Sequence, residues 1–69
     1  MPYPDPVPTR VRIQRILAAA HEPVTTRRLA ELAGTTHPQA ARILRRLEDD
    51  GAAVSQLAAG GCYAWMATR

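Results

Sequence analysis

The chain has 69 residues, a formal net charge of +3 and a hydrophobic fraction of 46%. This length allows one domain with a small core, and this composition excludes a chain that is disordered throughout. A single cysteine, Cys62, excludes an internal disulfide and a zinc site of several cysteines, and no apolar run approaches the roughly 18 residues of a membrane span.

The charged residues are unevenly distributed. Every permanently positive residue is an arginine, and half of the six acidic residues form one run at positions 48–50. Segregated charge of this kind suits an anionic partner such as nucleic acid. The alternative is that the arginines only keep helix surfaces soluble.

Residues 1–9 read "MPYPDPVPT", with proline at every second position. Proline lacks a backbone donor and disfavours helix at the residue before it. We therefore expect a flexible arm or linker at residues 1–9, followed by a domain at residues 10–69. A proline-rich ligand for a partner protein is the alternative.

The first helix is expected to begin after Thr9 as its N-cap and to run to about His21. Pro23 ends it, because the residue before a proline avoids helical angles. Val24 should then be a single extended, buried residue. Apolar residues recur at helical spacing and define the inner face: Ile13, Ile16, Leu17 and Ala20.

A second helix should follow, capped by Thr25 or Thr26 and ended by Gly34, a residue suited to positive φ. Its inward residues are expected to be Leu29, Ala30, Leu32 and Ala33.

A third helix should begin two residues after Gly34, with Thr36 as its N-cap and Pro38 in its first turn. Gly51 should close it. The core face is expected to consist of Ala40, Ile43, Leu44 and Leu47.

The remaining residues predict a two-stranded hairpin, in which "AAVSQL" and "CYAWMA" flank the turn sequence "AAGG". An isolated hairpin is not stable in water, so one face must pack on the helices. We expect that face to carry Tyr63 and Trp65, with Trp65 buried near Ile13 and Ile16, because these aromatic side chains offer the most area.

Three helices and a hairpin, with "LAELAG", a Gly-x-Thr turn and "LRRLEDDG" in this order, resemble a winged helix-turn-helix domain of the bacterial transcriptional-regulator type. The resemblance covers about residues 10–67. It implies a mainly α fold with a small β-hairpin, the wing. It also implies sequence-specific binding of double-stranded DNA, with the third helix in the major groove.

The resemblance also implies which residues contact DNA. Gln39 has the donor and acceptor that adenine requires, Arg42 can pair with guanine, and the small Ala41 permits close approach. The free amides at the start of the second helix favour phosphate. The expected base contacts are His37, Gln39, Ala41 and Arg42. The expected phosphate contacts are Thr26, Arg27, Arg28, Thr36, Arg45 and Arg46.

Several of these residues have alternative roles. Surface ion pairs of Arg45 with Asp49, and of Arg46 with Asp50, would compete with phosphate for the arginines. The alternative for His37 is that it caps or packs at the start of its helix without contacting DNA. The acidic run should point away from DNA.

The wing tip, "SQLAAGGC", has no charge. The alternatives for the wing are backbone contacts through Ser55, Gln56 or glycine amides, a structural role, or a contact with a partner protein. The arginines at the start of the first helix, or the arm, could supply the missing charge.

We therefore expect a transcriptional regulator, of the repressor type. The alternatives are the recognition domain of a larger DNA translocase or plasmid-transfer protein, and a winged-helix protein-interaction module. A homodimer on a palindrome and tandem monomers on repeats both remain open.

No nucleophile–base spacing, metal cluster or phosphate-binding loop is present in the sequence, so we expect no enzyme activity, cofactor or metal. The chain contains no Lys, Asn or Phe, which suggests a GC-rich bacterial genome. A cytoplasmic, nucleoid-associated protein without membrane contact from this domain is expected.

Overall fold

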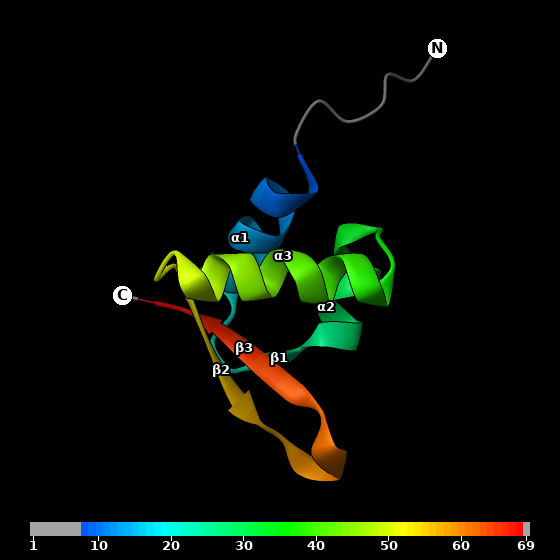
Figure 1. Ribbon diagram of the computed structural model, residues 1–69, viewed down its shortest axis with the longest axis vertical. Helices are drawn as coiled ribbons and strands as arrows, with labels where there is room; N and C mark the ends of the chain where they lie inside the picture. The colour runs from blue at the N-terminus through cyan, green and yellow to red at the C-terminus, as the bar shows by residue number, and fades with distance from the viewer. Residues whose placement is uncertain (1–7, 69) are drawn as a thin grey trace.

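The computed structural model describes residues 8–68, and Figure 1 shows the arrangement of its elements. Helices and strands alternate at the start of the chain, and a hairpin ends it. In chain order the elements are α1 (Thr9–Ala19), β1 (Val24–Thr25), α2 (Thr26–Ala33), α3 (His37–Asp49), β2 (Ala53–Leu57), the short 3-10 turn η1 (Ala59–Gly61) and β3 (Tyr63–Ala67).

The first helix differs from its expected limits at both ends. Pro8, not Thr9, is the N-cap residue, and the carbonyl of Pro8 accepts from the amides of Val11 and Arg12 at 3.0 and 3.1 Å. The helix ends at Ala19, because the next residue already has extended angles. Residues 1–7 of the expected arm lie outside the described residues.

The helix-turn-helix unit is formed as the sequence predicts. The hydroxyl of Thr25 accepts from the amide of Arg28 at 3.2 Å, and that of Thr36 accepts from the amide of Gln39 at 3.4 Å. Gly34 has a φ of 70°, which lets the chain leave α2 sharply and begin α3 three residues later. The turn therefore fixes α3 relative to α2.

The sheet has three antiparallel strands in the order β1-β3-β2, one more than the expected hairpin. Val24 pairs with Trp65 and therefore belongs to a strand, which agrees with its expected extended conformation. Its side chain is half-buried rather than fully buried as expected. The sheet thus joins the helix-turn-helix unit to the wing, the β2–β3 hairpin, whose tip points away from the helices at the bottom of Figure 1.

The core lies between the three helices and the sheet. Eight of the expected helix residues are buried there together with Ala53 and Trp65: Ile13, Leu17, Leu29, Ala30, Ala33, Ala40, Leu44 and Leu47. Ile16 and Ile43, also expected in the core, are partly buried and pack against it, and Ala20 is half-buried. The expected inward orientation of Leu32 is wrong, since 50% of this residue is exposed. The inner face of α2 is formed at helical spacing by Thr26, Leu29, Ala30 and Ala33, and Leu32 lies off it.

Trp65 is 4% exposed, as expected, and belongs to the same buried cluster as Ile13. The expected burial of Tyr63 is wrong, because 54% of it is exposed. Residues two apart share a face of a strand, so Tyr63 does face the helix side of the sheet. It lies nearer the wing tip than Trp65, beyond the cover that the helices provide.

Candidate nucleic-acid interface

The outward surface of α3 is a ridge opposite the buried residues Ala40, Leu44 and Leu47. Helical spacing places residues 38, 41, 42 and 45 together on that ridge. They line a shallow depression of about 370 Å³, formed by Pro38, Ala41, Arg42 and Arg45. Ala41 is small enough to leave the surface open beside the two arginines.

The arginines of α3 are exposed. Within residues 8–68, neither Arg45 nor Arg46 has an acidic partner within 4 Å, so the alternative ion pairs to the acidic run are not formed. Asp50 instead accepts from Arg10 at 2.6 Å, and a carboxylate oxygen of Glu48 accepts from the Ser55 hydroxyl at 2.7 Å. Two of the three acidic side chains are thus held by other elements.

The first helix uses two arginines within the fold. Arg10 pairs with Asp50 at the end of α3, and Nη1 of Arg12 donates to the carbonyl of Ala33 at 3.2 Å. These contacts attach α1 to the C-terminal ends of both other helices. Arg10 also lies beside Arg42 and Arg46 around a second depression of about 210 Å³. The positive surface therefore continues from α3 toward α1.

The start of α2 contributes two exposed arginines and one buried threonine. Arg27 and Arg28 are exposed, and Nε of Arg27 lies 3.9 Å from a carboxylate oxygen of Glu31, an exposed pair of little strength. Thr26 is only 7% exposed, and its hydroxyl accepts from the indole nitrogen of Trp65 at 2.8 Å. The Thr26 side chain is thus engaged in the core.

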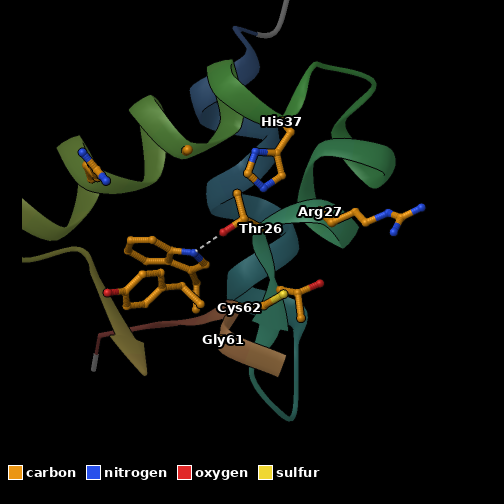
Figure 2. Close-up of a pocket in the computed structure, with 10 residues that line it drawn as sticks. Thr26, Arg27, His37, Gly61 and Cys62 are labelled. Atoms are coloured by element: carbon orange, nitrogen blue, oxygen red, sulfur yellow. Dashed lines mark hydrogen bonds between the residues drawn. The ribbon is translucent and has the colours of Figure 1, made fainter. Parts of the chain in front are cut away.

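A cleft of about 490 Å³ separates α3 from the wing. His37, Ala41 and Arg45, each four residues apart, form the wall on α3. Figure 2 shows the imidazole of His37 pointing into the cleft, Gly61 and Cys62 on the opposite wall, and the Arg27 guanidinium pointing away. The residues that line the cleft include Arg27, His37 and Arg45 but no acidic residue.

Two other predicted contacts, Thr36 and Gln39, lie at the N-terminus of α3. Gln39 is exposed, but it lines neither the ridge depression nor the cleft. The side chain of Thr36 is exposed and caps the helix. Tyr63, which lines the cleft, was not predicted as a surface residue, and no local sequence signal distinguishes its exposure from that of Trp65.

Among residues 8–68, no group of three or more His, Cys, Asp or Glu side chains could hold a metal ion. No helix in this part of the chain is long and apolar enough to cross a membrane.

Comparisons with known proteins identify the fold. No family model matches the chain, and a search of curated proteins finds no match. Among solved structures, a MarR family transcriptional regulator from Silicibacter pomeroyi DSS matches with a TM-score of 0.77 and 23% identity. The match covers 88% of this chain and 41% of that one. The chain therefore has a winged helix-turn-helix fold, and it spans less than half the length of this neighbour.

Proposed function

We propose that this domain binds double-stranded DNA sequence-specifically, with α3 in the major groove, as the DNA-binding part of a transcriptional repressor. The ridge of α3 carries this proposal, because Arg42 and Arg45 are exposed there beside the small Ala41. An arginine held at a groove can bond both acceptors of a guanine edge, and an alanine can touch a thymine methyl group.

The charge distribution around α3 supports the same proposal. The exposed arginines lie on α3 and at the start of α2, while Asp50 and Glu48 bond to Arg10 and Ser55. A phosphate backbone would therefore meet arginine side chains and the free amides of a helix N-terminus. The solved neighbour is a transcriptional regulator of the same fold, which agrees with this role.

Each residue has a role in the proposal. His37, Gln39, Ala41 and Arg42 contact bases near the mouth of α3. Thr26 contributes its backbone amide, because its hydroxyl is bonded to Trp65. The other phosphate contacts are Arg27, Arg28, Thr36, Arg45 and Arg46.

Selection from a pool of random duplexes tests the proposal. We expect one short motif to be enriched, and its form tells how the protein binds. A palindrome indicates a symmetric dimer, and a tandem motif indicates monomers on repeats. A single directional motif favours the recognition domain of a larger DNA translocase or plasmid-transfer protein.

The uncharged wing favours a second candidate, a protein-interaction module. Residues 51–68 contain no charged side chain, so this surface offers no direct attraction to phosphate. Failure to enrich any motif, together with no binding of any duplex at micromolar protein, would replace the DNA-binding proposal with this one.

A further inference from the structure

The wing carries a pair of exposed apolar residues on the face that it turns toward the helices. Leu57 of β2 lies directly opposite Tyr63 of β3 in the strand register. Opposed residues of antiparallel strands have their side chains on the same face and close together. Leu57 is 68% exposed and Tyr63 is 54% exposed, so the pair forms an uncovered apolar surface near the wing tip.

This apolar pair adjoins the cleft between α3 and the wing. Tyr63 itself lines the cleft, and His37 and Arg45 line the wall on α3. No acidic residue lines the cleft itself, and Glu48, which lines the adjoining hollow with Arg45 and Tyr63, accepts a hydrogen bond from Ser55. One surface therefore passes from the ridge of α3, across His37 and Arg45, to an apolar pair on the wing.

The order of these surfaces, from ridge to cleft to wing, can be compared with the order of features on a DNA duplex. The sugar-phosphate strand that forms one wall of the major groove also forms a wall of the neighbouring minor groove. A protein with a helix in the major groove reaches that minor groove by crossing this strand. With α3 in the major groove, Arg45 would face the phosphates of that strand, and the wing beyond it would lie toward the minor groove.

We propose that the wing inserts Leu57 and Tyr63 into the minor groove as an apolar wedge, where other wings use a basic side chain. This inference rests on the proposed DNA binding through α3. Apolar side chains inserted in the minor groove part neighbouring base pairs and bend the duplex. The glycines of the tip, Gly60 and Gly61, have positive φ and no side chain, which lets the tip approach the backbone closely.

The test compares Leu57→Ala/Tyr63→Ala with the wild type on the duplex enriched by selection. We expect the double variant to bind at least about fivefold more weakly. The slope of affinity against salt should stay the same, because apolar contacts release no counterions. Bending of the duplex, measured by energy transfer between labelled ends, should decrease. Tyr63→Phe, which keeps the ring, should retain both affinity and bend.

Val54→Ala is the matched control. Val54 lies on the same strand and is 51% exposed, but it pairs with Met66 and so lies on the opposite face from Leu57. It should leave both affinity and bending unchanged. The emission of the buried Trp65 and the circular dichroism of each variant report that the fold is intact.

Three results would overturn the wedge. The double variant could keep wild-type affinity and bend on a duplex that the wild type binds, which leaves DNA binding through α3 standing. Val54→Ala could weaken binding equally. The protein could also self-associate without DNA in sedimentation experiments and lose that association in the double variant, which would assign the pair to a contact between copies. Failure of the wild type to bind any duplex would instead remove the proposed function itself.

Discussion

The indole nitrogen of Trp65 donates a hydrogen bond to the hydroxyl of Thr26 at 2.8 Å, across 39 positions of the chain. The bond is buried, and it joins the central strand of the sheet to the first turn of α2. Val24 and Thr25, just before that turn, pair with the same strand. The wing is therefore held to the helix-turn-helix unit by both backbone and side-chain contacts, which fixes its position relative to α3.

Removing the acceptor of this bond should destabilise the domain. Thr26→Val keeps the volume but leaves the Trp65 indole buried without its partner, which costs about 1–3 kcal/mol. Denaturant unfolding followed by circular dichroism, which can be recorded with or without Trp65, measures the loss. In a Trp65→Phe background the same substitution should cost less, since no donor remains to be satisfied. Equal costs in both backgrounds would show that the bond contributes nothing specific.

The turn between α2 and α3 should depend on Gly34. Its φ of 70° is unfavourable for a residue with a Cβ, although a Cβ built there meets no atom within 4 Å. Gly34→Ala should therefore cost about 1–2 kcal/mol through backbone strain alone. Gly34→Asn should cost less, because asparagine tolerates this region better. Thermal unfolding of the two variants provides the comparison, and an alanine variant as stable as the wild type would contradict it.

Much of the helix-turn-helix unit could be predicted because its signals are local. The caps at Thr25 and Thr36, the positive φ of Gly34 and the inner stripe of α3 depend on residues within one or two turns. Helical spacing also assigns the ridge of α3 correctly, since the core residues determine which face remains outside.

The remaining features depend on contacts between distant segments. The strand β1 has two residues, too few for an alternating pattern, and it exists because β3 provides partners. The pair of Arg10 with Asp50 joins the two ends of the helical unit, and no spacing rule connects them. Tyr63 and Trp65 share a face, but how far the helices cover that face is a property of the packed molecule. Their very different exposures therefore could not be predicted.

Binding to DNA should depend strongly on salt. Four of the exposed arginines on α2 and α3 are proposed phosphate contacts, and about four such contacts predict a slope of log affinity against log salt of about −4. Arg27→Ala and Arg28→Ala should weaken binding to all duplexes alike, and each should flatten the slope by about one unit. Arg15→Ala is the control, because Arg15 is exposed on α1 and should leave the slope unchanged. Affinity that does not vary with salt would indicate a protein partner instead.

Sequence-specific contacts and non-specific attraction to DNA should come from different residues of α3. Arg42 shares the outward ridge with Pro38 and Ala41, near the helix mouth, whereas Arg46 lies one turn further along and beside Arg10. Arg42→Ala should cost about 1–3 kcal/mol on the selected duplex and much less on a scrambled one. Gln39→Ala should act similarly at a neighbouring base pair.

Arg46→Ala is the matched control for Arg42→Ala, because it removes the same charge from the same helix. It should lower affinity for both duplexes together, as loss of a phosphate contact does. Titrations of each variant on selected and scrambled duplex, at one fixed salt concentration, measure both effects. An equal shift of both curves by Arg42→Ala would show that Arg42 contacts phosphate rather than bases. The specificity would then have to come from another surface, and the wing, with Leu57 and Tyr63 exposed beside the cleft, is the one that adjoins α3.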